Sequence, residues 1–79
     1  MTEFTVVSTR EEAFKVWDRR GVIIREDDGY YFVYPRLGRG IKYPGFDLKR
    51  DCCLNTFISR EKAEQWALDM GYLSSFIRS

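Results

Sequence analysis

Residues 22–34 read VIIREDDGYYFVY, and this stretch predicts the centre of the fold. Residues 22–26 are rich in β-branched side chains and residues 30–34 in aromatic ones, and both kinds favour strands. Residues 27–29 between them suit a hairpin turn, with Gly29 at the positive-φ position of a type I turn closed by a bulge. The stretch therefore predicts two antiparallel strands joined by a short turn.

The expected turn also fixes which side chains share a face of the hairpin. Counting back from it pairs Ile24 with Phe32 and Val22 with Tyr34, and we expect this face to lie in the core. The other face is apolar enough to be partly covered or to bind a partner. Its members are Ile23, Arg25, Tyr31 and Val33.

Two similar helix-opening phrases flank the hairpin. TREEA at 9–13 and SREKA at 59–63 each begin with a hydroxyl residue suited to an N-cap. Gly21 and Gly71 follow at the same offset and would supply the left-handed residue that stops a helix. We therefore expect helices over 9–20 and 59–70. Common capping preferences explain the repeat more simply than an internal duplication does.

The apolar residues of both predicted helices recur at helical spacing, which indicates one buried face on each. We expect the two helices to pack on one face of the sheet through Val16, Trp17, Trp66 and Met70. The full stripes are Ala13, Val16, Trp17 and Arg20 in the first helix, and Ala63, Trp66, Ala67 and Met70 in the second.

Together these elements predict a small α+β fold in one compact domain, residues 1–79. Further strands are expected at 4–8 and 54–58, and the apolar tail after Gly71 should dock or add a short strand. The expected architecture is an antiparallel sheet of three to four strands, with the hairpin at its centre and both helices on one face. A split β-α-β arrangement, with the tail adding a strand, is the topological alternative.

Charge is nearly balanced overall but uneven along the chain. Thirteen basic against twelve acidic residues give a net charge of +1, which is no global signature of nucleic-acid or membrane binding. Pro35 should end the second hairpin strand, and residues 36–51 are expected to form an irregular loop. This loop holds Arg36, Arg39, Lys42, Lys49 and Arg50.

The residue types available argue against catalysis. There is no histidine, which removes the commonest catalytic base and metal ligand. Two adjacent cysteines, Cys52 and Cys53, cannot close a four-ligand zinc site, and neighbouring residues rarely form a disulfide. We read one thiol as a small buried hydrophobe and expect no catalytic residue, metal or cofactor.

The expected location is the cytoplasm. The first residues lack the basic region and apolar run of a signal peptide, and no apolar run is long enough to span a membrane. The absence of a disulfide framework fits a reducing compartment. We therefore expect no membrane partner.

These observations favour a non-enzymatic protein-binding module that acts by surface complementarity, because arginine and tyrosine are enriched at interface hot spots. A nucleic-acid-binding module using the basic loop and exposed tyrosines is the alternative, and a solvated loop anchored by Tyr43 and Phe46 is the plainest explanation. Small domains of this composition are common among phage- and plasmid-encoded modulators of host machinery. The candidate binding residues are Arg25, Tyr31, Val33, Arg36, Arg39, Lys42, Tyr43, Lys49 and Arg50.

Overall fold

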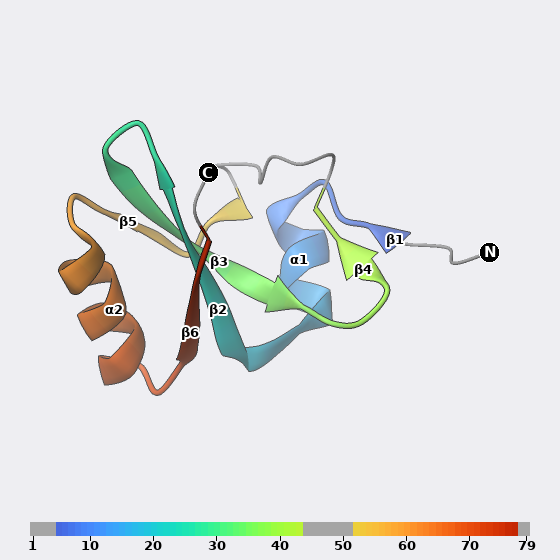
Figure 1. The fold of residues 1–79 in the computed structure, drawn as a ribbon. Coiled ribbons are helices and arrows are strands. Elements are labelled where there is room, and N and C mark those ends of the chain that lie inside the picture. Colours follow the sequence, from blue (N-terminus) through green and yellow to red (C-terminus); the bar gives the residue numbers. More distant parts are fainter. Residues whose placement is uncertain (1–4, 44–51, 78–79) are drawn as a thin grey trace.

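The computed structural model describes residues 5–43 and 52–77, and it is an α+β structure as predicted (Figure 1). Its elements, in chain order, are β1 (Thr5–Val6), α1 (Arg10–Val16), β2 (Trp17–Asp27), β3 (Tyr30–Leu37), β4 (Ile41–Lys42), β5 (Asn55–Phe57), α2 (Arg60–Asp69) and β6 (Leu73–Ile77).

The main sheet has four strands in the order β5-β3-β2-β6. The β2–β3 hairpin lies at its centre, as predicted, and β5 extends it antiparallel to β3. The tail after Gly71 becomes β6 and pairs parallel to β2, so the sheet is mixed rather than wholly antiparallel. The split arrangement with an added tail strand is therefore the correct topology. β1 pairs with β4 in a separate parallel pair of strands.

The hairpin register differs by one residue from the predicted one. Asp27 pairs with Tyr30, so the turn contains two residues instead of three. Asp28 has φ of 53° and Gly29 has φ of 82°, and two successive residues at positive φ are the pattern of a type I′ turn. The prediction failed because aspartate tolerates the left-handed region better than most residues do. Ile24 consequently lies opposite Val33.

A shift of one residue moves every partner side chain to the other face of the sheet. Val33 therefore joins Val22 and Ile24 in a core with Ala63 and Ala67 of α2. Phe32 and Tyr34 point the other way, and six of the described residues form the buried part of their core. These are Val7, Ala13, Phe32, Tyr34, Tyr43 and Cys52.

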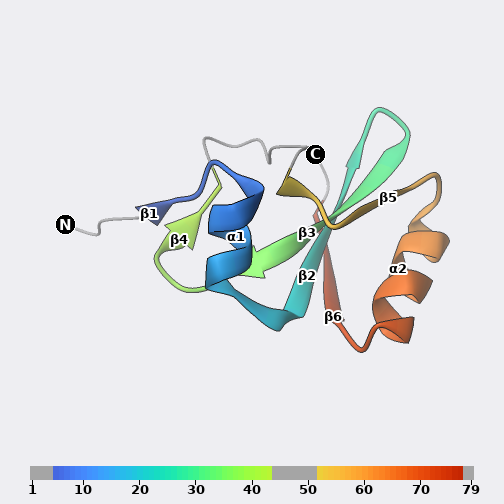
Figure 2. The ribbon, with the colours of Figure 1, turned by 180° about the vertical axis from the view of Figure 1, so that it is seen from behind.

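The two helices cover opposite faces of the sheet, contrary to the expectation that they share one. α2 lies on the side of Val33, and α1 lies on the side of Phe32 and Tyr34 (Figures 1 and 2). The reason is visible in β3, whose consecutive apolar residues bury side chains on both faces. A strand of this kind needs cover on both sides.

Helix α1 begins as predicted but ends early. The Thr9 hydroxyl accepts a hydrogen bond from the Glu12 backbone N–H at 3.2 Å, which caps the helix, and Ala13 is buried. The helix ends at Val16, and Trp17 already belongs to β2. The expectation that Gly21 stops this helix is wrong, because the strand takes over four residues earlier.

Helix α2 matches the prediction at both ends. The Ser59 hydroxyl accepts from the Lys62 N–H at 3.2 Å. Gly71 has φ of 80°, its N–H donates to the Leu68 carbonyl, and the Tyr72 N–H donates to the Ala67 carbonyl. This pair of bonds is a Schellman motif. Met70 is 53% exposed, however, so the expected contact between the helices through Met70 is not made.

The segment after β3 is more regular than predicted. Pro35 does not end the strand, which runs on to Leu37, and Ile41–Lys42 forms β4. The Tyr43 hydroxyl is buried and donates to the Pro35 carbonyl at 2.8 Å. Tyr43 therefore anchors this segment, as the plainest explanation expected, and burial raises the pKa of its phenol. Residues 44–51, with Phe46, lie outside the described part.

Candidate functional site

A bulge in β2 is the most irregular feature of the described sheet. The ladder with β3 pairs Trp17 with Leu37 and then resumes only at Val22 with Pro35. Residues 18–21 therefore lie opposite Arg36 alone. Arg19 within the bulge has φ of 68°, which is uncommon for a residue with a side chain. Strained backbone of this kind persists only where its surroundings hold it.

Asp18 and Trp17 hold the bulge in place. The Asp18 carboxylate accepts from the backbone N–H groups of Arg20 at 2.8 Å and Gly21 at 3.0 Å. These hydrogen bonds lower the pKa of Asp18, and the nearby charges of Arg36 and Arg20 add to the effect. The buried Trp17 indole N–H donates to the Gly21 carbonyl at 2.7 Å. The side chains of Asp18 and Trp17 thus bind the backbone of the bulge and hold its shape.

Gly21 is required here for close approach rather than for stopping a helix. A Cβ atom at Gly21 would lie 3.0 Å from Arg36 Nε and 3.1 Å from Arg36 Cβ, and both distances are tight. The Arg36 side chain therefore lies directly against the glycine.

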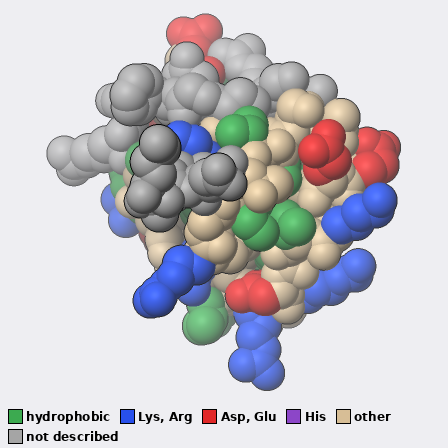
Figure 3. Space-filling model, turned by 90° about the vertical axis from the view of Figure 1, so that its right-hand side faces the viewer, with side chains coloured by type: hydrophobic (Ala, Val, Ile, Leu, Met, Phe, Trp, Pro, Cys, Tyr) green, Lys and Arg blue, Asp and Glu red, His purple; other side chains and the backbone are tan. Residues whose placement is uncertain are grey.

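This geometry gathers four arginines at one end of the hairpin, which we call the arginine end. Arg19 and Arg20 come from the bulge, Arg36 from the facing strand and Arg39 from the turn between β3 and β4. All four are exposed, and the Arg19 guanidinium lies 6.0 Å from the Trp17 ring centre. On the side of the molecule that faces right in Figure 1, basic side chains project around the rim (Figure 3).

The other end of the hairpin is acidic. Glu26, Asp27 and Asp28 lie at and beside the turn between β2 and β3. The hairpin therefore carries mainly positive charge at one end, which also holds Asp18, and mainly negative charge at the other, which also holds Arg25. The balanced net charge of the whole chain hides this separation.

Only part of the predicted binding set lies at this surface. Arg36 and Arg39 belong to the arginine end, and Lys42 is exposed on β4 nearby in the chain. Tyr43 is buried and does not offer a stacking face. Lys49 and Arg50 lie outside the described residues.

The predicted outer face of the hairpin does not exist as a surface. Val33 is 0% exposed, because the two-residue turn places it in the core beneath α2. Arg25 lies opposite Phe32 and on the other face from Val33. Residues that the prediction grouped together are therefore divided between the two sides of the sheet.

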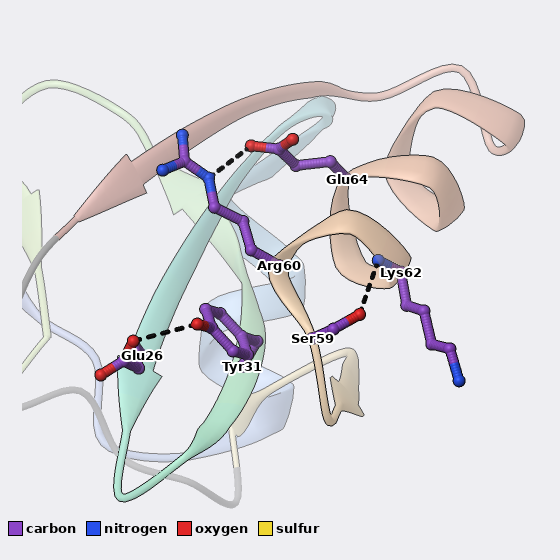
Figure 4. Close-up of polar contacts among 6 residues, drawn as sticks. All are labelled: Glu26, Tyr31, Ser59, Arg60, Lys62 and Glu64. Atoms are coloured by element: carbon purple, nitrogen blue, oxygen red, sulfur yellow. Dashed lines mark hydrogen bonds and ion pairs between the residues drawn. The ribbon is translucent and has the colours of Figure 1, made fainter.

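Tyr31 lies near the start of α2, and its contacts there support the fold (Figure 4). Its hydroxyl donates to Glu26 Oε2 at 3.0 Å, which raises the pKa of Tyr31, and its ring lies 6.3 Å from that of Phe76. The Arg60 guanidinium stacks on Phe76 at 4.0 Å and pairs with Glu64 through a 2.8 Å contact. These contacts hold the hairpin, α2 and β6 together.

The sequence does not point to Arg19 and Arg20, because its pattern predicts a first helix over residues 9–20 that contains both. One signal could have found them. Asp18 is a residue whose side chain competes for nearby backbone N–H groups, and such residues favour turns over helix interiors. An aspartate just before the predicted glycine stop was therefore a reason to end the helix sooner.

The described residues offer little for metal or thiol chemistry. Cys52 is buried, as expected of a small hydrophobe, and both cysteines are free thiols. Within residues 5–43 and 52–77, no group of three potential ligands could hold a metal ion, and no helix is long and apolar enough to cross a membrane. Comparisons with protein-family models, curated proteins and solved structures find no match for this chain.

Proposed function

We propose that this chain is a non-enzymatic protein-binding module that docks an acidic surface of its partner against the arginine end. The observation that carries the proposal is the convergence of Arg19, Arg20, Arg36 and Arg39, from two separate segments, on one end of the hairpin. Glu26, Asp27 and Asp28 lie at the opposite end of the hairpin. Asp18 lies at the arginine end, where its carboxylate accepts backbone N–H groups, so one carboxylate stands against four arginines.

Arginine suits this role for chemical reasons. A guanidinium group presents five donors in a planar fork that matches a carboxylate, and arginine is enriched at interface hot spots. The bonds from Asp18 and Trp17 fix the backbone beneath the cluster. A surface whose backbone is already ordered loses less conformational entropy on binding.

The positions of the aromatic rings favour a protein partner over nucleic acid. Non-specific binding of single strands uses exposed rings on which bases stack. Tyr34, Tyr43 and Trp17 are buried in the two cores. Tyr30 is 50% exposed, but it lies beside the acidic turn, where phosphate groups would be repelled.

Two free thiols agree with a reducing compartment, and we propose the cytoplasm. An inhibitor of host machinery is one form that a module of this size could take. The docking proposal depends only on the exposed charges of the arginine end.

The proposal is tested by comparing two charge reversals in affinity purification from nuclease-treated extract of the source organism. Arg39→Glu changes the arginine end, and Lys62→Glu makes the same charge change on exposed α2. We expect Arg39→Glu to lower recovery of specific partners at least tenfold and Lys62→Glu to retain them. Circular dichroism confirms that both variants fold. Equal recovery with the two variants contradicts the site.

A second measurement tests the nucleic-acid alternative. Labelled single-stranded and duplex oligonucleotides are titrated with the chain at low and moderate salt. Phosphate contacts release counterions, so such binding falls steeply as salt rises. Submicromolar, salt-sensitive binding that Arg39→Glu abolishes would replace the protein proposal with the nucleic-acid one.

A further inference from the structure

The four-stranded sheet has two edges, and they differ in length and chemistry. β5 is a three-residue strand, whereas β6 has five residues. Natural edge strands are commonly protected by charges, proline, bulges or short length. Residues 73–77 read LSSFI and contain no charge, proline or glycine. Within the part of the chain that the structure describes, the β6 edge therefore lacks these usual protections.

The exposed apolar side chains of β6, Leu73 and Ile77, lie on one face of the sheet. The register with β2 places Leu73, Ser75 and Ile77 on the face of Ile23 and Arg25. Leu73 is 68% and Ile77 45% exposed. Helix α1 covers this face over β3, where its core lies, while β6 stands at the far edge of the sheet.

We propose that β6 pairs with β6 of a second copy of this chain, antiparallel and about a two-fold axis at Ser75. The two four-stranded sheets then form one continuous sheet of eight strands. Backbone groups on the outer edge of β6 gain partners in this arrangement, which is the usual way that an open edge recruits a strand.

The sequence of β6 is complementary to itself about this axis. Antiparallel pairing centred on Ser75 places Leu73 opposite Ile77 of the second copy, and the symmetry makes this contact twice. On the α2 face it places the small Ser74 opposite the large Phe76. The two most exposed apolar residues of β6 thus cover each other.

Charge complementarity favours the antiparallel orientation. β6 runs parallel to β2, so the β2 strands of the two copies run in opposite directions. The arginine end of one copy therefore lies beside the acidic end of the other, formed by Glu26, Asp27 and Asp28. A parallel pairing would place like charges side by side.

This charge effect is small beside the strand pairing itself. Strands lie about 4.8 Å apart, so two intervening β6 strands separate the β2 strands by about 14 Å. That distance exceeds the Debye length of about 8 Å at physiological salt, so the charges bias orientation mainly at low salt. One short strand pair offers less than the roughly 800 Å² per partner of a standard interface, and we expect a weak, concentration-dependent dimer.

The test uses sedimentation velocity over a range of concentrations. In the proposed register Ser75 faces its own copy, and its side chain is exposed in the monomer. Ser75→Lys and Ser75→Glu should therefore each abolish the dimer, because like charges meet at the axis. An equal mixture of the two variants should restore it as a heterodimer, because opposite charges then meet.

The matched control is Thr56→Lys, an exposed position on the other edge strand, β5. It should leave the dimer intact. A wild-type chain that stays monomeric at every concentration overturns the proposal, as does loss of the dimer in Thr56→Lys with retention in Ser75→Lys. A mixture that fails to restore the dimer overturns the register. None of these variants touches the arginine end, so the result is independent of the proposed function.

Discussion

The two helices begin alike and end differently. Thr9 and Ser59 cap them through the same bond at 3.2 Å, to the N–H three residues on. α2 then runs for ten residues to a glycine stop, whereas α1 gives way to a strand after seven. The comparison shows that the residues at a helix start are enough to determine it, whereas the position of a helix end depends on the contacts that the following residues can make.

Trp17 accounts for the early end of α1. Its ring packs between Phe14 at 6.0 Å and Tyr72 at 5.4 Å, and its indole N–H is bonded to the Gly21 carbonyl. Its backbone pairs with Leu37 of β3. These contacts favour a strand conformation at Trp17 over another turn of helix. At the equivalent point α2 has Ala67, which has no such side chain to place.

The largest expected change in stability comes from removing the Trp17 indole. Trp17→Ala should cost about 3–5 kcal/mol of unfolding free energy, because it deletes a buried ring and leaves the Gly21 carbonyl without its partner. Trp66→Ala should cost less, since Trp66 is only partly buried. Urea denaturation measures both, and equal losses would contradict the special role of Trp17.

The two glycines give the next effect. Gly71→Ala should cost about 1–2 kcal/mol because φ is 80° there, and Gly71→Asn should cost less because asparagine tolerates that region. At Gly21 the order should reverse, since space beside Arg36 limits the site and asparagine is larger than alanine. Urea denaturation of the four variants tests this, and the same order at both positions would refute it.

The two caps should be equivalent. Thr9→Ala and Ser59→Ala should each cost about 1 kcal/mol, because each leaves one helix N–H without its acceptor. Thermal and urea unfolding provide the measurement. A difference larger than about 1 kcal/mol would show that tertiary packing, rather than the cap, sets one of the helix starts.

The smallest effect is a pH dependence at Asp18. Its folded pKa lies below the ordinary value, so the stability it contributes is complete above the unfolded pKa. That contribution is lost as pH falls below about 4 and through the folded pKa. The stability gap between wild type and Asp18→Ala should therefore shrink between pH 5 and pH 2. A gap that stays constant over this range would contradict the role of the carboxylate.

The parts of the fold that depend on interactions between neighbouring residues could be predicted from the sequence. Both caps, the Gly71 stop, the hairpin and the tail strand could be read from neighbouring residues. The register could not, because Asp27-Asp28-Gly29 suits a three-residue or a two-residue turn, and the choice decides whether Val33 faces α1 or α2. A run of apolar residues in β3 fits either answer.

The candidate site was predicted in part. Arg36 and Arg39 stood out as charges in a segment rich in glycine. Arg19 and Arg20 join them only because the sheet brings residues 18–21 opposite Arg36, a long-range pairing that no local pattern encodes. The sequence pattern predicts a surface position for Val33 and leaves Tyr43 open between a binding surface and a core anchor. Apolar and aromatic side chains look alike in sequence whether they bind a partner or fill a core.

The parallel pairing of β6 with β2 has a consequence for how the chain folds. The hairpin joins sequence neighbours and can form early, but β2 gains its second neighbour only after β5 and α2 have been synthesised. Non-local pairings of this kind slow folding. Until β6 arrives, a long central strand presents an open edge on the nascent chain. The interval between these two events is when this protein is most exposed to misassembly.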